Sequence, residues 1–179
     1  MAQSNLSQRK QVEIYTDGAA VPNPGSGGYG VVLKFGKHRK ELSGGFLHTT
    51  NNRMELMAAI VGLEALKETC KVTLYSDSQY LVNSMSQGNV VRWKTRGWRL
   101  LSNGKYVKNP DLWERLLAAC EDQEVRFVWV RGHSGNVENE RCDRLALVAL
   151  RGTSLDEDVG YLEPVVTGTS EMELAFGDE

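Results

Sequence analysis

Residues 12–18 read Val12-Glu13-Ile14-Tyr15-Thr16-Asp17-Gly18 and alternate in a way that predicts a strand with one buried face. Apolar or small side chains occupy every second position of this stretch, and bulkier polar ones lie between them. We expect Asp17 to end the strand, because Gly18 frees the backbone to turn. Ligands commonly bind beyond the carboxyl ends of strands, so Asp17 is a candidate site residue.

The composition is that of one globular domain. A chain of 179 residues with 41% hydrophobic content can bury a sizeable core. No apolar run approaches the ~18 residues of a membrane span, and residues 1–10 lack a signal peptide's hydrophobic region. Three widely spaced cysteines without a C-x-x-C pair favour neither a disulfide framework nor a zinc site. We expect a monomeric cytoplasmic protein that does not contact a membrane.

The charge is segregated along the chain. The net charge is -2, but residues 155–179 contain eight acidic residues and no Lys or Arg. Residues 1–154 therefore hold 21 basic and 15 acidic residues, a net charge of +6. Residues 78–110 contain six basic residues and no acidic one. A basic body with a concentrated basic stretch indicates a polyanionic partner, and from about Thr167 the sequence predicts a disordered acidic tail.

Periodicity predicts the remaining elements. Strands are expected at 31–35, 39–47, 72–77 and 125–130, and helices near 52–66, 78–85, 111–119 and 137–150. The first three strands have short connections and form an antiparallel meander, whereas the strand at 72–77 follows a helix and adds in parallel. The Pro/Gly-dense loop at 19–28 lacks the GK[ST] sequence of a P-loop and precedes a strand, which argues against nucleotide binding.

Three more acids stand at the ends or edges of predicted elements: Glu55, Asp77 and Asp143. Each has a plain structural explanation. Glu55 fits a capping box with Asn52 as N-cap, Asp77 could cap the helix that follows it, and Asp143 could pair with a neighbouring arginine. If they instead meet Asp17 in space, the four carboxylates form a site for two cations.

Two further features suggest chemistry or binding. His133 lies between two glycines in a predicted loop, next to the helix that carries Asp143. Residues 92–99, Arg-Trp-Lys-Thr-Arg-Gly-Trp-Arg, place four cations and two indoles together without an acid. A loop histidine is more often inert, a charged run is more often a solvated face, and tryptophan is more often core. The absence of compensating acids nevertheless favours a nucleic-acid contact.

Several motifs together resemble bacterial ribonuclease H of type 1. The matching runs are Tyr15-Thr16-Asp17-Gly18-Ala19, Asn23-Pro24-Gly25, Thr49-Thr50-Asn51-Asn52-Arg53-Met54-Glu55-Leu56, Ser76-Asp77-Ser78-Gln79-Tyr80, Trp93-Lys94, Gly97-Trp98, Asp111-Leu112-Trp113, Gly132-His133-Ser134-Gly135 and Glu138-Asn139-Glu140-Arg141-Cys142-Asp143. The resemblance covers about residues 9–164. It implies an α/β ribonuclease H-like fold, a mixed five-stranded sheet of order 3-2-1-4-5 flanked by helices.

The resemblance also implies an activity: metal-dependent hydrolysis of the RNA strand of RNA–DNA hybrids, leaving 5′-phosphate and 3′-hydroxyl ends. Asp17, Glu55, Asp77 and Asp143 would be the catalytic carboxylates that hold two Mg²⁺ ions, with Mn²⁺ as an alternative. His133 would move protons or help to release product. Two cations would neutralise the crowded acids and stabilise both the entering and the leaving oxygen.

Substrate contacts follow from the same resemblance. It implies minor-groove contacts by Gly18, Asn51, Asn52 and Gln79, and phosphate contacts by Asn23, Thr50 and Arg53. Trp93, Lys94, Arg96, Trp98 and Arg99 would form the basic protrusion that lies against the DNA strand. The stretch 86–91 departs from the family pattern by one extra residue and a missing tryptophan. We assign 1–164 to the catalytic domain and 165–179 to the acidic tail.

Two other functions on this fold remain open at the level of sequence. A hybrid- or duplex-binding module without activity would be indicated by loss of one of the four acids, and all four are present. A transposase- or integrase-like protein would need strand-transfer partners and further domains that 179 residues barely accommodate.

Overall fold

A computed structural model describes residues 9–162, and the predicted acidic tail lies outside this range. The five strands are β1 (Lys10–Val21), β2 (Gly25–Phe35), β3 (His38–Thr49), β4 (Cys70–Ser76) and β5 (Glu124–Trp129). The helices are α1 (Asn51–Glu64), α2 (Gln79–Ser86), α3 (Asn89–Thr95), α4 (Pro110–Cys120), α5 (Val137–Ala149) and the single turn α6 (Val159–Leu162). None of the helices within residues 9–162 has the length and apolar character needed to cross a bilayer.

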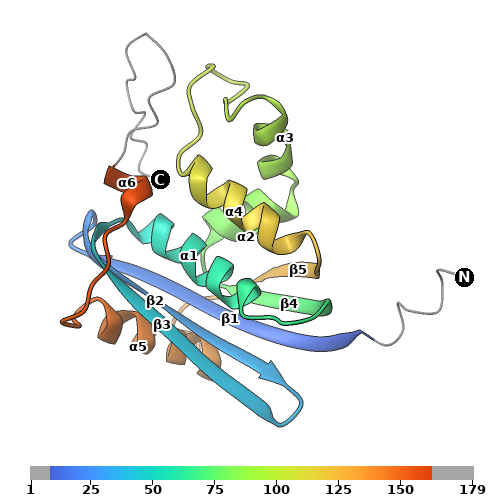
Figure 1. Ribbon diagram of the computed structural model, residues 1–179, viewed down its shortest axis with the longest axis vertical. Coiled ribbons are helices and arrows are strands. Elements are labelled where there is room, and N and C mark those ends of the chain that lie inside the picture. The colour runs from blue at the N-terminus through green and yellow to red at the C-terminus, as the bar shows by residue number, and fades with distance from the viewer. Residues whose placement is uncertain (1–8, 163–179) are drawn as a thin grey trace, which may run out of the picture.

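The strands form one mixed sheet in the order β3-β2-β1-β4-β5, which confirms the predicted topology (Figure 1). β1 pairs antiparallel with β2 and β2 with β3, so the first three strands are the expected meander. β4 joins β1 in parallel and β5 joins β4 in parallel. The register places Thr16 of β1 beside Ser76 of β4, so residues 17 and 77 emerge at the same level of the sheet.

The first two strands are longer than predicted. β1 does not end at Asp17 but continues to Val21, paired with the glycine-rich start of β2. These glycines were expected to form a loop, yet they serve helix packing. A Cβ at Gly28 would lie 2.4 Å from the Ala146 carbonyl oxygen of α5, and one at Gly30 would lie 2.1 Å from that of Cys142. Asp17 is therefore held inside a strand rather than at its end.

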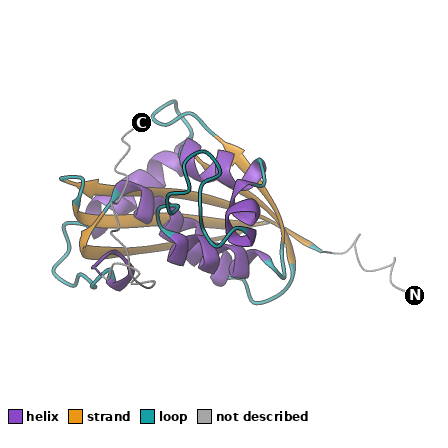
Figure 2. Ribbon diagram, turned by 90° about the horizontal axis from the view of Figure 1, so that it is seen from above, coloured by secondary structure: helices purple, strands orange, loops and turns teal. Residues whose placement is uncertain are grey.

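Helices cover both faces of the sheet (Figures 1 and 2). α1 lies across one face with α4 packed beside it, and α5 lies on the other face against β1 and β2. The core lies mainly between the sheet and α1, where Ile14 and Leu74 meet Met54, Leu56 and Ile60, all 0% exposed. Burial of one such side chain stabilises the fold by about 1.5–3 kcal/mol. α1 is thus fixed firmly against the strand that carries Asp17.

The residues that cap α1 and α2 are not the ones considered from the sequence. Thr50, not Asn52, caps α1, and its side chain accepts a hydrogen bond from the Arg53 amide at 3.3 Å. Ser78, not Asp77, caps α2 and accepts from the Leu81 amide at 3.2 Å. A hydroxyl group satisfies one free amide at each of these helix starts. The carboxylates of Glu55 and Asp77 are consequently not used as caps.

Candidate active site

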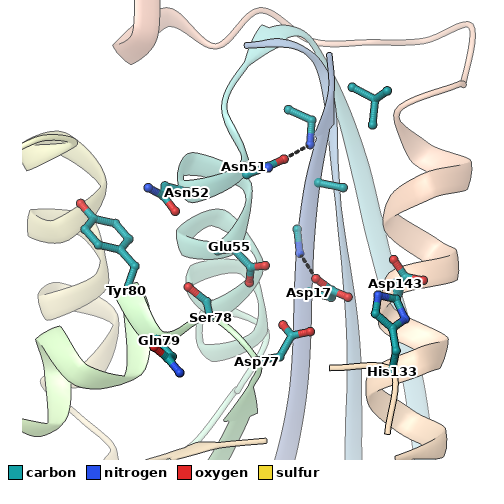
Figure 3. A pocket seen from close by; sticks show the side chains of 14 residues that line it. Asp17, Asn51, Asn52, Glu55, Asp77, Ser78, Gln79, Tyr80, His133 and Asp143 are labelled. Atoms are coloured by element: carbon teal, nitrogen blue, oxygen red, sulfur yellow. Dashed lines mark hydrogen bonds between the residues drawn. The ribbon is translucent and has the colours of Figure 1, made fainter. Parts of the chain in front are cut away.

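A cleft opens where β1, α1, the β4–α2 junction and the loop before α5 meet (Figure 3). Polar and acidic side chains dominate its lining. The residues that line it are Asp17, Gly18, Ala19, Ala20, Val21, Asn51, Asn52, Glu55, Asp77, Ser78, Gln79, Tyr80, His133 and Asp143. The four acids singled out in the sequence therefore share one cleft with the loop histidine.

Asp17, Glu55 and Asp77 form the centre of this cleft. Each offers a carboxylate oxygen, and the three oxygens lie within 4.8 Å of one another. They come from the middle of β1, the second turn of α1 and the residue after β4. Gly18 makes this convergence possible, because a Cβ there would lie 2.3 Å from the Glu55 amide nitrogen. Its own amide donates to Asp17 Oδ1 at 2.7 Å and orients that carboxylate.

The environment disfavours full ionisation of these acids. Burial raises the pKa of Asp17 to about 7, with further increases from the negative charges of Asp77 and Asp143. Burial also raises the pKa of Glu55 well above its usual range, followed by the charges of Asp17 and Asp77. Crowded buried carboxylates must either retain protons or bind cations. A set of three carboxylate oxygens is a hard-oxygen donor set, which fits Mg²⁺ or Mn²⁺ better than softer metals.

Asp143 and His133 lie on the opposite side of Asp17 from Glu55 (Figure 3). Asp143 projects from α5 into the cleft but is not one of the three acids that converge within 4.8 Å. His133 is exposed and has a positive φ of 50°, which holds its loop in an unusual conformation for a residue other than glycine. The predicted group of four acids is thus a triad with a fourth acid at its edge.

Asn51 is among the expected substrate contacts that line the cleft, and its position is fixed by hydrogen bonds. Its side-chain Oδ1 accepts a hydrogen bond from the Ala20 backbone amide at 2.5 Å, and its backbone amide donates to Asn23 Oδ1 at 3.1 Å. The oxygen of the Asn51 carboxamide is therefore occupied, which leaves its NH₂ group to act as the donor. Gly18, Asn52 and Gln79 also line the cleft, whereas Asn23 and Thr50 are not part of its lining.

Arg53 is placed differently from the phosphate contact expected for it. It is only 2% exposed and lies between Asp158, with 2.6 Å between Nε and Oδ2, and Asp111, with 2.7 Å between Nη2 and Oδ2. Its Nη1 also donates to Asn109 Oδ1 at 3.3 Å. Because its donors are already bonded to protein groups, the guanidinium acts as a buried ion-pair centre that joins α1 to α4 and to the segment before α6.

The basic stretch forms α3 and the loop after it, outside the lining of the cleft. Lys94 and Arg96 are exposed, with Lys94 Nζ 3.6 Å from Glu114 Oε1. Arg99 stacks over Tyr106 at 4.1 Å from the ring centroid and donates to its hydroxyl at 2.7 Å. The two tryptophans, Trp93 and Trp98, are half-buried against the core cluster. The exposed charges of residues 92–99 therefore all belong to lysine and arginine side chains.

Sequence reasoning missed the residues that support Asp77. Trp129 Nε1 donates to the Asp77 carbonyl oxygen at 3.0 Å, which joins the ends of β4 and β5. Asn139 Nδ2 donates to Asp77 Oδ2 at 3.3 Å from α5. The spacing of Asn139 and Asp143, one helical turn apart, was the available signal, because side chains four residues apart share a helix face.

Comparison with known proteins agrees with this geometry. Residues 9–151 match the RNase H protein family. Ribonuclease H of Syntrophus aciditrophicus is 61% identical over 153 residues, covering 86% of this chain and 88% of the relative. Ribonuclease H of Rippkaea orientalis is 60% identical over 153 residues, covering 85% of this chain and 93% of the relative.

Two solved structures show the same fold at lower sequence identity. LC9-RNase H1, a type 1 RNase H with the type 2 active-site motif, superposes with a TM-score of 0.72 at 28% identity, covering 82% of this chain and 74% of that one. LC11-RNase H1, solved in complex with an RNA/DNA hybrid, gives a TM-score of 0.57 at 28% identity, covering 78% of this chain and 96% of that one. The family match and the high identity to these relatives show that this chain belongs to the ribonuclease H family.

Proposed function

We propose that this protein is an endonuclease that hydrolyses the RNA strand of RNA–DNA hybrids. The observation that carries the proposal is the convergence of Asp17, Glu55 and Asp77 within 4.8 Å, in a cleft that also contains His133 and Asp143. Membership of the ribonuclease H family and the hybrid complex of LC11-RNase H1 support this substrate. Since all five residues come from one chain, a monomer would suffice for activity.

The acids would hold two divalent cations, Mg²⁺ or Mn²⁺. Asp17 is central, with Glu55 and Asp77 on one side and Asp143 on the other (Figure 3). When bound, the cations would supply charge stabilisation for the entering and leaving oxygens of an in-line displacement at phosphorus. Loading requires the acids to be ionised, so the raised pKa values of Asp17 and Glu55 make proton release part of cation binding.

The remaining residues of the cleft would bind and orient the hybrid. Asn51, Asn52 and Gln79 present amide groups beside the carboxylates, where they can form hydrogen bonds with 2′-hydroxyl groups and base edges in the shallow minor groove. His133 is exposed at the rim and can carry a proton to or from the reacting phosphate. Attack by water with departure of the 3′ oxygen would leave a 5′-phosphate and a 3′-hydroxyl.

We assign this activity to residues 1–164 and place the acidic segment 165–179 outside the catalytic domain. The family match covers residues 9–151, which lie within the proposed catalytic domain. The basic charge of residues 92–99 would contact the phosphates of the DNA strand. We further propose that the protein acts in the cytoplasm, where reducing conditions keep Cys70, Cys120 and Cys142 as free thiols.

One assay tests the proposal. Labelled RNA–DNA hybrid, double-stranded RNA and double-stranded DNA are each incubated with the protein in Mg²⁺ and in EDTA. We expect cleavage of the hybrid alone, in its RNA strand, and only with Mg²⁺. The 5′ ends of the products should accept a label from a kinase only after phosphatase treatment. Cleavage that survives in EDTA, or equal cleavage of all three duplexes, would refute the assignment.

A further inference from the structure

Asn139 on α5 is a buried side chain with one bonded end and one unbonded end. The residue is 2% exposed, and its Nδ2 donates to Asp77 Oδ2 at 3.3 Å. Its Oδ1 is shielded from solvent and accepts no hydrogen bond from any group within residues 9–162. A buried carbonyl oxygen without a donor carries an uncompensated desolvation penalty. Such an atom in a folded protein calls for an explanation.

The carboxamide of Asn139 has one acceptable orientation. A flip that exchanged Oδ1 and Nδ2 would bring its oxygen against the Asp77 carboxylate, so that two acceptors faced each other. The hydrogen bond to Asp77 therefore fixes the orientation of the Asn139 carboxamide and leaves its Oδ1 without a donor. Leucine, which has a similar shape and no polar atom, would suit a purely structural role at this position better.

Asp77 is enclosed by contacts that restrict its position. A Cβ at Gly132 would lie 2.5 Å from Asp77 Oδ2, so the loop before α5 passes directly against this carboxylate. Trp129 holds the Asp77 carbonyl oxygen, which fixes the backbone but not the side chain. The hydrogen bond from Asn139 acts on the carboxylate itself. It thereby links the orientation of Asp77 to α5, the helix that also carries Asp143.

We propose that Asn139 is a positioning residue for Asp77. Its amide N–H holds Asp77 Oδ2 and keeps the carboxylate grouped with those of Asp17 and Glu55, ready to bind a divalent cation. This inference rests on the proposed function, because it concerns the same carboxylates. Leaving Oδ1 buried and unbonded lowers the stability of the protein, and the site gains the hydrogen bond from Nδ2 to Asp77 in return. Partners that orient metal ligands typically change metal affinity or activity by about 10–100-fold when they are removed.

The test uses the full chain with Asn139→Leu, and Asn139→Ala as a second variant that cannot be overpacked. Calorimetric titration with Mg²⁺ should show affinity about 10–100-fold lower in both variants. Turnover on the hybrid should fall at limiting Mg²⁺ and recover partly in excess Mg²⁺. In EDTA, the melting temperature of Asn139→Leu should equal or exceed that of the wild type, because the substitution removes the buried, unbonded Oδ1. Ser84→Ala, which alters another buried polar residue, should leave Mg²⁺ affinity unchanged.

One outcome would overturn the proposal: Mg²⁺ affinity within about twofold of the wild type in both Asn139 variants, whether or not their melting temperatures fall. The residue would then be merely structural. Hybrid cleavage by the wild type tests the proposed function separately. If the wild type binds Mg²⁺ but does not cleave the hybrid, the proposed function fails while the comparison of affinities still decides the role of Asn139.

Discussion

Under the proposed function, Asp17 is the residue at which stability and function conflict most directly. Its side chain is 8% exposed and faces the charges of Asp77 and Asp143, and burial with these charges raises its pKa to about 7. Glu55, with its pKa also raised, lies against it. Without cations the folded protein therefore binds more protons than the unfolded chain between about pH 4 and pH 7. Stability without metal should fall as the pH rises through that window.

Asp17→Asn should abolish hybrid cleavage and yet stabilise the metal-free protein at pH 7–8. Removing one negative charge relieves repulsion, and we expect a gain of about 1–3 kcal/mol in the free energy of unfolding. At pH 4, where Asp17 is protonated in the folded wild type, the gain should largely vanish. Urea unfolding in EDTA at both pH values measures this difference. Substantial residual cleavage, or a large loss of stability at pH 8, would contradict the central position of Asp17.

We expect His133 to act at the rim of the cleft and not as a cation ligand. Imidazole suits softer metals than Mg²⁺, and the side chain is exposed rather than grouped with the acids. We expect His133→Ala to lower turnover by one to two orders of magnitude, at or just below the ~10²–10⁴ range of general acid–base effects. Mg²⁺ affinity measured by calorimetry should barely change.

A second variant separates the imidazole of His133 from its backbone. The φ of 50° is more readily adopted by asparagine than by alanine, so His133→Asn keeps the loop conformation while removing the imidazole. Equal losses of turnover in both variants would assign the effect to the side chain. Full activity in His133→Asn would show that only the loop conformation matters, and greatly weakened Mg²⁺ binding in either variant would make His133 a ligand.

At the scale of elements, the sequence predicted the order of strands and helices because each has clear periodicity. The true lengths of β1 and β2 could not be predicted in this way. Gly28 and Gly30 resemble loop residues in sequence, and only the packing of α5 reveals why a strand needs them. The same limit applied to Arg53, whose partners Asp111 and Asp158 are 58 and 105 residues away in the chain. Local patterns identify a charged residue, but distant partners decide whether it is free to bind a ligand.

The ion-pair centre at Arg53 fastens the last described segment to the rest of the fold. Asp158 is 4% exposed, bonds to Arg53 and accepts from the Thr49 hydroxyl at 2.5 Å. Two main-chain hydrogen bonds of 2.9 Å also pair Asp156 with Gly45 and Leu47 at the edge of β3. α6 is consequently anchored to the start of α1, the helix that positions Glu55.

We expect Asp158→Asn to destabilise the protein by about 3–5 kcal/mol, because it leaves the Arg53 guanidinium buried and only partly compensated. Glu68→Gln provides the matched control, since it breaks the exposed pair between Lys10 and Glu68 and should change stability far less. Urea unfolding in EDTA measures both. Equal effects of the two substitutions would mean that the buried pair contributes no more than a surface contact.

At the scale of the whole molecule, charge is arranged along the fold. The net charge of +6 in residues 1–154 is opposed by eight acids in residues 155–179. Within the described part, exposed cations are found both on α3 and at the far end of the β2–β3 hairpin. These two regions lie at opposite ends of the molecule (Figure 1). A general attraction to polyanions would involve the cations of both regions. A bound hybrid that extends from the cleft over α3 would involve the cations of α3 and not those of the hairpin.

Salt dependence distinguishes these two cases. Lys94 and Arg96 are exposed, whereas Arg99 is also held by Tyr106, so the variant changes only the first two to alanine. Each lost phosphate contact should flatten the slope of log K against log salt by roughly 0.9, or about 2 in total. The strand that is cut should not change, because phosphate contacts position a duplex without identifying it.

The control replaces Lys37 and Lys40, exposed at the hairpin end, and should leave the slope unchanged. Equal slopes for wild type and the Lys94/Arg96 variant would make α3 a solvated face, and equal flattening by both pairs would replace a defined binding path with a diffuse positive field.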